Sequence, residues 1–247
     1  LSRSSAASDV YKRQEQSCDV YLYELAKRVG IKRIGEMAAR FGFGEAFNFG
    51  LPGENRGLIP TPAWKRKTFG QAWHAGETLI TSIGQGFILC TPLQLAVMTS
   101  RLVNGGRPVL PRLMKNERAE IQKRKSLQLS PQHLHIVLKG MDKVVNGSLG
   151  TARKVVDPSM KFQFGGKSGS VQVKRISLDE RESGKLKNKD RPWRERDHAM
   201  FVAFAPLKSP RYVVSVVVEH GGGGSTMAAP IARDILAEAL RLNPSKL

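Results

Sequence analysis

Long apolar runs are missing from the 247 residues. None approaches the roughly 18 to 20 consecutive apolar residues of a membrane-spanning helix, and the first residues lack a charged start followed by an apolar block. We therefore expect this chain neither to span a membrane nor to carry its own export signal. An apolar share of 40% still excludes a wholly disordered chain and fits one sizeable core, or a core with appendages.

Cysteine and acidic residues are both scarce. Cys18 and Cys90 could form at most one disulfide, which excludes a disulfide-stabilised scaffold. The formal net charge of +19 indicates an anionic partner. Nucleic acid, an anionic membrane surface, an acidic polymer and a carboxylate-bearing substrate all satisfy this charge, so composition does not choose among them.

The first fourteen residues, LSRSSAASDVYKRQ, differ in texture from the rest of the chain. They are rich in Ser and Ala and have no apolar period. They resemble the translated adapter sequence that is sometimes left on fragments assembled from sequencing reads. We expect residues 1–14 to be a non-native, adapter-like segment, and residues 15–247 to be the C-terminal portion of a larger domain.

Apolar periodicity predicts helices in the first 150 residues. Two short helices over residues 20–29 and 34–41 are stopped by Gly30 and Gly42, and another begins at a Thr91 cap and ends at Asn104. A fourth is predicted over residues 131–145. Residues 50–86 read as a long irregular segment, and the charged residues 107–129 as surface.

The last third predicts an antiparallel sheet and a closing helix. Strands are expected over residues 167–173, 199–205 and 212–218, with a tight hairpin between the last two. The β-branched run of the third strand predicts burial on both faces. A C-terminal helix with its apolar stripe from Ile231 to Leu240 can lie on this sheet, and residues 174–197 read as a basic, mobile loop.

The stretch GGKSGSVQV places a cation and two hydroxyls at the start of the first strand. Lys167, Ser168 and Ser170, expected on or near one side, could converge on a carboxylate, while Gly169 lets a ligand backbone approach closely. The main-chain N–H of Ser170 could also donate to an oxyanion. These four residues alone are equally compatible with a simple turn into a strand.

A second motif lies far upstream, where Ser17, Cys18 and Asp19 precede a helix. With both motifs present, the chain resembles the transpeptidase domain of class B penicillin-binding proteins, most closely the penicillin-binding protein 2 type. The resemblance runs from about Glu15 almost to the end. Its motifs follow in the family's order: SCDVYLYELAKRVGI, FGFG, GENRGLIPTPAWK, SIGQGFILCTPLQLAVM, NGG, GTA, GGKSGSVQV, HAMFVAFAP and VVVEHGGGG.

The resemblance implies a fold and a set of roles. The fold would be α/β (α+β) of the serine β-lactamase/transpeptidase type, a central antiparallel sheet flanked by helices and incomplete at the N-terminus. Ser168 and Ser170 would hold the terminal carboxylate of a peptidoglycan stem peptide beside Gly169, and Lys167 would supply positive potential. Ser17 would relay a proton, and Asp19 would position the catalytic lysine or the substrate amide.

The family's nucleophile, in an S-x-x-K motif upstream of SCD, is missing from the chain's start. By the resemblance, we expect the intact protein to be a serine-type D,D-transpeptidase that cross-links stem peptides during cell-wall elongation and binds β-lactams, while this fragment is inactive alone. It would sit in the bacterial inner membrane through a missing anchor, with its transpeptidase domain in the periplasm. Its partners would be a SEDS-family glycosyltransferase and elongation scaffold proteins, without a cofactor.

Alternative interpretations of the sequence assign the protein, or single residues, another function. A serine β-lactamase-like hydrolase would share the fold, but no deacylating residue is evident. A basic nucleic-acid-binding module would fit the charge, yet the basic loop carries a single aromatic residue, Trp193, so we expect no nucleic-acid partner. Cys18 reads as a small buried residue, with a zinc ligand as the minor alternative. His74, His198 and His220 read as structural or surface residues, and residues 221–224 as a flexible turn.

Overall fold

The computed structural model describes residues 10–48, 50, 52–114, 126–174, 177, 180, 182 and 188–243. These residues form two compact units. The sheet unit takes its residues from the ranges 1–16 and 137–247, and the helical unit from residues 17–136. The boundary falls inside helix α7, Pro131–Asn146. Among the helices of the described ranges, none is both long and apolar enough to cross a membrane.

The sheet unit is built on three antiparallel strands. β1 (Gly165–Val171), β2 (His198–Ala205) and β3 (Tyr212–Val218) lie in that order, so β2 is central. The predicted hairpin between β2 and β3 is confirmed, and β1 begins two residues before its predicted start. The antiparallel sheet with helices that the sequence predicted is therefore present in this unit.

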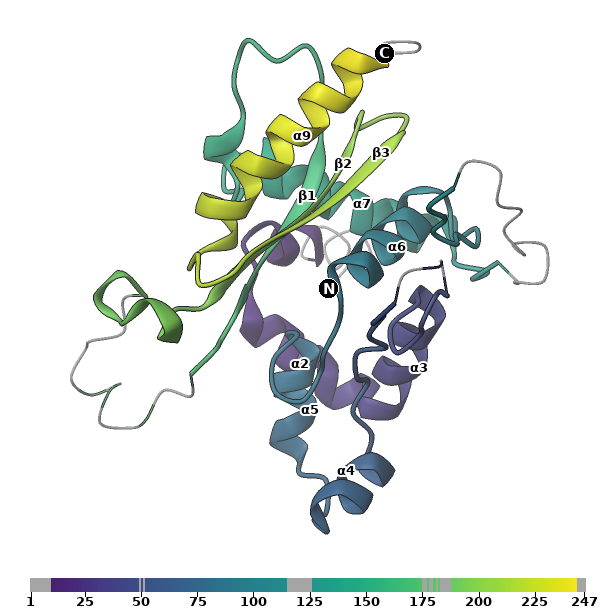
Figure 1. Ribbon diagram of the computed structural model, residues 1–247, viewed down its shortest axis with the longest axis vertical. Helices are drawn as coiled ribbons and strands as arrows, with labels where there is room; N and C mark the ends of the chain where they lie inside the picture. Colours follow the sequence, from purple (N-terminus) through teal and green to yellow (C-terminus); the bar gives the residue numbers. More distant parts are fainter. Residues whose placement is uncertain are drawn as a thin grey trace, which may run out of the picture. The chain divides into compact units, whose positions relative to one another are not determined.

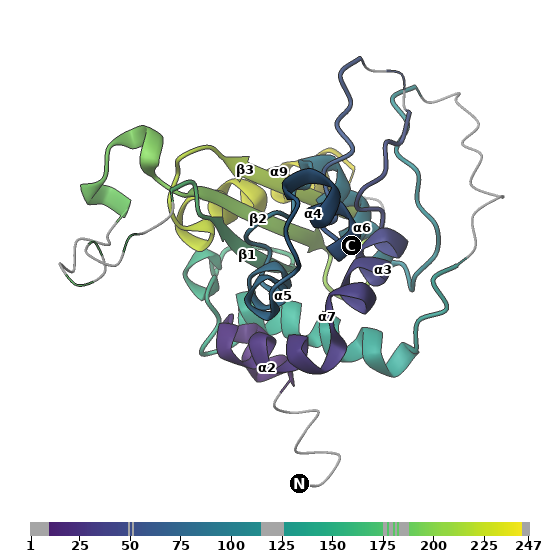
Figure 2. The ribbon, with the colours of Figure 1, turned by 90° about the horizontal axis from the view of Figure 1, so that it is seen from below.

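One face of the sheet carries the core of this unit. Helix α9 (Ala229–Leu242) lies along β2 and β3 in both ribbon views (Figures 1 and 2). Its buried Leu236 and Leu240 belong to the same apolar cluster as Phe201 of β2 and Val216 of β3. Burying each side chain of this size contributes at most about 1.5 to 3 kcal/mol to the free energy of folding. This contribution determines which face of the strands is internal.

Strand β3 departs from its predicted burial on both faces. Only Val214 and Val216 are buried, while Val213, Ser215 and Val217 on the opposite face are half-buried. The β-branched run indicated two covered faces because it could not show which strand would be last in the described sheet. A last strand has a partner strand on one side only, which reduces its cover.

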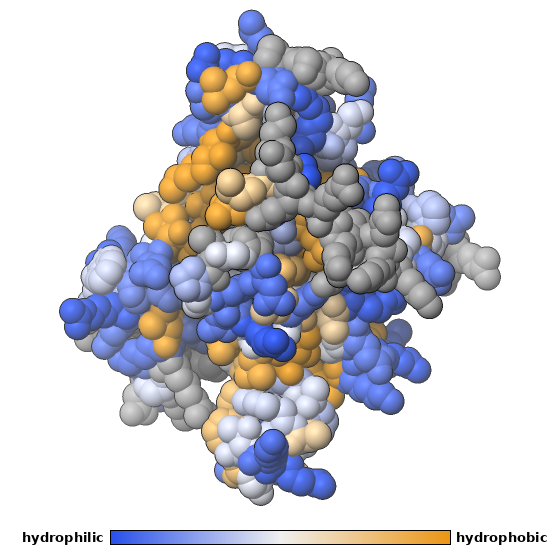
Figure 3. Space-filling model, turned by 45° about the vertical axis from the view of Figure 1, so that its right-hand side comes forward, coloured by the Kyte–Doolittle hydropathy of each residue, from blue (hydrophilic) through white to orange (hydrophobic). Residues whose placement is uncertain are grey.

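The outer face of α9 is apolar as well. Ile231, Ile235 and Leu242 each expose more than two fifths of their surface. Figure 3 shows orange, apolar side chains gathered in a band at the height of α9 and the sheet. Since exposed apolar side chains in a contiguous group mark surfaces that other groups cover, this helix has two apolar faces and only one of them is occupied within the sheet unit.

A short helical segment, residues 10–15, packs on α7 in the sheet unit (Figure 2). The side-chain amide of Gln14 donates to the carbonyl oxygen of Val137 at 3.1 Å, and the ammonium of Lys139 lies 4.8 Å from the ring centroid of Tyr11. The non-native origin of residues 1–14 and the boundary at residue 15 stay predictions. Residues 10–14 nevertheless have defined packing partners here.

The helical unit contains five helices wholly within its described residues. They are α2 (Asp19–Val29), α3 (Ile31–Phe41), α4 (Pro62–Phe69), α5 (Ala75–Ser82) and α6 (Pro92–Val103). The predicted stops at Gly30 and Gly42 are confirmed, as is the Thr91 cap, whose hydroxyl accepts from the main-chain N–H of Gln94 at 3.1 Å. The sequence missed α4 and α5, which occupy the stretch expected to be irregular.

Buried polar side chains hold the loops of the helical unit in place. The side-chain oxygen of Gln94 accepts from the main-chain N–H of Thr91, and its NH₂ group donates to the carbonyl oxygens of Glu45 and Arg56 at 3.0 and 2.8 Å. Every bond of this fully buried amide goes to main chain, as burial of a polar group requires. One α6 residue therefore holds the α3–α4 connection at two points, Glu45 and Arg56.

The segment 107–129 is not only a charged surface. Leu127 is buried, and its main-chain N–H donates to the carbonyl oxygen of Gly106 at 2.8 Å. Part of the predicted surface, residues 115–125, lies outside the described residues. The predicted basic loop, residues 174–197, is likewise described only in part, and its end is anchored by short 3₁₀ turns at residues 188–190 and 193–195.

Candidate functional site in the sheet unit

The K-S-G motif lies on β1, where alternation of the strand separates its side chains. Ser168 and Ser170 pair with Phe201 and Ala199, whereas Lys167 pairs with Val202. Because successive side chains in a strand point to opposite faces, the two hydroxyls share one face and Lys167 takes the other. Of the three side chains expected on or near one side, the two serines share a face, and the side chain of Lys167 starts from the opposite one.

Lys167 nevertheless stays close to the motif's main chain. Its ammonium donates to the carbonyl oxygen of Ser168 at 2.9 Å, and the side chain is half-buried. This bond folds the cation back along the strand instead of extending it into solvent. A positive charge is therefore held beside the strand segment that carries both hydroxyls.

Thr151 adds a third hydroxyl beside the two serine hydroxyls of β1. Its Oγ1 lies 3.3 Å from Oγ of Ser168, within hydrogen-bond distance. The turn that carries Thr151 is fixed by the buried Glu15: the Glu15 carboxylate accepts from the N–H of Leu149 at 3.1 Å, and its carbonyl accepts from the N–H of Thr151 at 3.3 Å. Thr151 belongs to the GTA motif, but the sequence predicted no role for it.

Ser170 is held from the other direction. Its Oγ accepts from the main-chain N–H of Gly224 at 3.4 Å. A Cβ on Gly224 would lie 2.2 Å from the carbonyl oxygen of Met200 and 2.3 Å from that of Gly169, so only glycine fits. The glycine run was expected to be a flexible turn before the last helix. It is a turn, but Gly224 is packed directly on the K-S-G strand.

Two further glycines make room for aromatic rings on the sheet. A Cβ on Gly165 would lie 2.7 Å from the ring of Phe204, and one on Gly166 would lie 2.5 Å from the ring of Phe201. Glycine at these positions lets the rings of the central strand extend over β1. The repeated glycines before Lys167 therefore serve packing, and the motif is carried by a strand with a buried, well-defined neighbour.

β1 pairs with β2 alone among the described strands, so its second edge has no strand partner in that part of the chain. Such an edge presents main-chain N–H and C=O groups to which an extended peptide can add as a further strand. A peptide bound there would find the hydroxyls of Ser168 and Ser170 beside it. The predicted donor role of the Ser170 main-chain N–H stays a prediction.

The second predicted motif belongs to the helical unit. Ser17 has a positive φ of 51°, Cys18 is the N-cap residue of α2, and Asp19 is the first residue of that helix. A carboxylate in the first turn is stabilised by the positive end of the helix dipole. Asp19 is exposed, and Ser17 and Cys18 are half-buried. The catalytic roles of Ser17 and Asp19 stay predictions.

The cysteines are free thiols. Cys18 is half-buried instead of buried, and the described residues contain no group of three or more His, Cys, Asp or Glu side chains that could hold a metal ion. Burial raises the pKa of the Cys90 thiol, so this side chain stays protonated near neutral pH. The Cys90 thiol is therefore a packed side chain, and the roles expected for Cys18 stay predictions.

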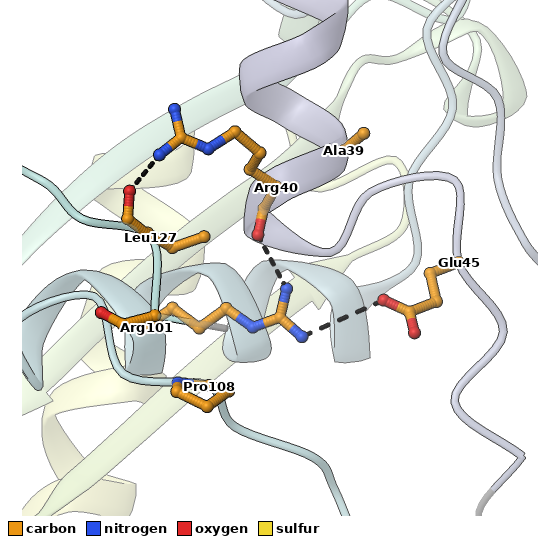
Figure 4. A pocket seen from close by; sticks show the side chains of 7 residues that line it. Ala39, Arg40, Glu45, Arg101, Pro108 and Leu127 are labelled. Carbon is orange, nitrogen blue, oxygen red and sulfur yellow. Dashed lines mark hydrogen bonds and ion pairs between the residues drawn. The ribbon is translucent and has the colours of Figure 1, made fainter. Parts of the chain in front are cut away.

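Two cavities lie elsewhere. One, of about 320 Å³ in the helical unit, is shown in Figure 4. It is bordered by Arg101, which is almost fully buried and donates to the carbonyl oxygens of Arg40 and Val109 at 3.0 and 3.1 Å while Glu45 lies 4.0 Å away. These bonds are structural, because they tie α6 to two segments of main chain.

The other cavity, of about 900 Å³, lies at the β2–β3 turn and is lined by residues 160–163 and 206–211. The strand register places this turn beside Gly165, at the opposite end of β1 from Ser170. Neither cavity is lined by Ser168 or Ser170. The candidate site is the hydroxyl-bearing strand of the sheet unit, where Ser168 is half-buried and Ser170 is exposed.

Comparison with known proteins shows the family of this chain. The family described as penicillin binding protein transpeptidase domain matches residues 3–237. The peptidoglycan D,D-transpeptidase MrdA of Haemophilus influenzae is 37% identical over 237 residues, covering 93% of this chain and 36% of that protein. The chain thus spans about a third of the length of the curated relatives it matches.

Solved structures give the same result at the level of the fold. Pseudomonas aeruginosa PBP2 in complex with WCK 5153 is 37% identical, with a TM-score of 0.79, over 93% of this chain and 48% of that one. Helicobacter pylori PBP2, in its complex with MreC, is 32% identical with a TM-score of 0.80, over 95% of this chain and 40% of that one. This chain therefore belongs to the penicillin-binding protein transpeptidase family and is of the penicillin-binding protein 2 type.

Proposed function

We propose that the whole protein is a peptidoglycan D,D-transpeptidase of cell-wall elongation, and that this chain supplies its substrate-binding strand. The observation that carries the proposal is the pair of hydroxyls, Ser168 and Ser170, on one face of β1, with Thr151 in hydrogen-bond reach and the Lys167 ammonium folded against the same strand. Hydroxyls beside a cation are suited to a carboxylate, and a strand edge is suited to a peptide.

The proposed reaction is acyl transfer. A serine outside this chain, in an S-x-x-K motif, attacks the carbonyl carbon of the penultimate D-alanine of a stem peptide. The serine proton passes to a base and then to the leaving D-alanine nitrogen, so the amide breaks as the ester forms. The amine of a neighbouring stem then attacks the ester, forms the new amide and returns the proton to the serine.

Residues of this chain have distinct parts in the proposal. Ser168 and Ser170 hold the terminal carboxylate, and Gly169 permits close approach of the stem's main chain. Lys167 supplies positive potential, which lowers the energy of the bound anion. Ser17 relays the proton, and Asp19 positions the catalytic lysine or the substrate amide. Without the serine, this chain alone forms no acyl-enzyme.

We also propose the protein's setting. Because one relative was solved as a complex of PBP2 and MreC from Helicobacter pylori, elongation scaffold proteins are the proposed partners, together with a SEDS-family glycosyltransferase. The transpeptidase domain would work in the periplasm, held at the inner membrane by a segment outside this chain. The excess of basic residues fits association with anionic cell-wall polymer.

Penicillin labelling tests the proposal. A longer form of the protein that includes the upstream S-x-x-K serine is incubated with benzylpenicillin, and the mass of the intact protein is followed over time. We expect one stable adduct, which disappears when that serine is replaced by alanine. Absence of any adduct would contradict the transpeptidase assignment, and an adduct that is hydrolysed within seconds would identify a β-lactamase instead. The 247-residue chain is the negative control.

A further inference from the structure

Three ring side chains stack at the start of β2, next to the proposed site. The rings of Trp193 and His220 have centroids 4.4 Å apart, and those of His198 and His220 are 4.6 Å apart. His198 opens β2 and pairs with Val171, the residue after Ser170. The stack therefore lies at the end of β1 that carries the hydroxyls.

The hydrogen bonds of the stack show which imidazole nitrogens accept and which donate. The main-chain N–H of His220 donates to Nδ1 of His198 at 2.9 Å, so this nitrogen must carry a lone pair, and the ring proton belongs on Nε2. Nδ1 of His220 lies 3.0 Å from the carbonyl oxygen of Arg196, which can only accept. The two imidazoles thus have opposite roles: His198 accepts and His220 donates.

The bond to His198 holds the start of the glycine turn. His220 has a φ of 56°, and Gly222, two residues later, has a φ of 84°. Both lie in the left-handed region. The N–H of Gly222 donates to the carbonyl oxygen of Asp197 at 2.8 Å. Two residues later, the N–H of Gly224 reaches Oγ of Ser170. Adjacent residues 197 and 198 therefore anchor the turn that contacts the Ser170 hydroxyl.

We propose that His198 is a positioning residue for substrate binding, which holds the 220–224 turn through its neutral Nδ1 and thereby orients the Ser170 hydroxyl toward the stem carboxylate. The inference rests on the proposed function for its ligand. The geometry of the anchor itself does not depend on that ligand. Loss of the acceptor on His198 leaves the His220 N–H without this partner and releases the first residue of the turn.

The charged groups next to the stack have hydrogen-bond or ion-pair partners of their own. Asp197 precedes His198; the Asp197 carboxylate accepts from the side-chain amide of Asn188 at 2.9 Å and lies 3.7 Å from the guanidinium of Arg191. Arg196 is turned away, because its guanidinium donates to the carbonyl oxygens of Arg191 and Lys189.

Two substitutions of His198 distinguish the effect of its hydrogen-bond acceptor from the effect of its ring shape. H198N keeps an oxygen near the position of Nδ1, while H198F keeps the ring and removes the acceptor. The amide exchange rates of Gly222 and Gly224 are measured in the 247-residue chain by NMR. We expect H198F to accelerate both by about tenfold, as for loss of one hydrogen bond, and H198N to stay near the wild-type rates.

The ligand arm uses diacetyl-L-Lys-D-Ala-D-Ala as the probe. H198F is expected to weaken its binding about tenfold. H198N, which keeps an acceptor near the position of Nδ1, is expected to bind the peptide near the wild-type affinity. H220N is a matched control, since asparagine tolerates the left-handed region and keeps the main-chain N–H.

The two arms have separate meanings. Equal exchange at Gly222 and Gly224 in H198F and wild type would overturn the positioning role, whatever the ligand does. If H198F fails to fold, H198N decides: wild-type exchange rates at Gly222 and Gly224 support the inference, and faster exchange despite the retained acceptor overturns it. If wild type does not bind the peptide at all, the proposed function fails, while the exchange rates still decide the anchor.

Discussion

Replacing Lys65 by methionine is expected to destabilise the helical unit by about 3 kcal/mol, the lower end of the range for breaking a buried ion pair. Lys65 is only 3% exposed, and its ammonium lies 2.5 Å from Oε1 of Glu77, which is 19% exposed. Methionine fills a similar volume but leaves the Glu77 carboxylate without its partner. The pair joins α4 to α5, so both helices should loosen.

Urea unfolding followed by the fluorescence of Trp64 and Trp73 measures the change in free energy. The matched control is K27M, which breaks the exposed Lys27–Glu24 pair on α2 and should change stability by no more than about 0.5 kcal/mol. A similar small effect for K65M would show that the buried pair does not stabilise α4 and α5.

The same pair predicts a dependence on acid. Burial acts to raise the pKa of the Glu77 carboxyl, but the hydrogen bonds from Lys65 and from the main chain of His74 outweigh it, so the pKa is lowered. The ionised form therefore stabilises the fold: its contribution is present above the ordinary carboxyl pKa of about 4.3 and is lost as the pH falls through the lowered folded value. E77Q should flatten this acid-induced loss.

Replacing Gly224 by alanine is expected to have the second large effect, about 3 kcal/mol of destabilisation. The added Cβ would meet the carbonyl oxygens of Met200 and Gly169 at 2.2 and 2.3 Å, and main-chain atoms of paired strands cannot move aside independently. The turn must instead lift from β1, which removes the contact with Ser170. Stem-peptide binding should weaken together with stability.

Thermal or urea unfolding of G224A gives the stability change, and the diacetyl peptide gives the binding change. G76A is the matched control, because no atom lies within 4 Å of its added Cβ and the residue sits inside α5. It should be neutral or stabilise by up to about 1 kcal/mol. Wild-type stability and binding in G224A would show that the turn does not press on the strand.

The sequence predicted elements well where local signals were complete. Thr91 and Pro92 opened a helix as expected, with the Gln94 side chain closing the capping box. The same Thr-Pro signal at Thr61 opens α4, where the Thr61 hydroxyl accepts from the N–H of Trp64 at 3.1 Å. It was missed because α4 and α5 are only eight residues long and their apolar period is too short to stand out.

The sequence predicted the residues of the candidate site, but not the residues that hold them in place. The K-S-G motif identified the strand, and the alternation rule alone would have placed Lys167 apart from Ser168 and Ser170. Thr151 and Gly224 could not be found this way, because they reach the strand through tertiary contacts from segments 17 and 54 residues away. The repeated glycines were a local signal that another segment of the chain approaches them closely, but the sequence did not show which segment.

The most direct test of the account is an NMR titration of the 247-residue chain with diacetyl-L-Lys-D-Ala-D-Ala and with the same peptide bearing a C-terminal amide. If β1 binds the stem carboxylate, the largest amide shifts should fall on Ser168, Gly169 and Ser170 with the free acid and largely vanish with the amide. Equal shifts for both peptides, or shifts confined to residues away from β1, would contradict the assignment of this strand as the carboxylate site.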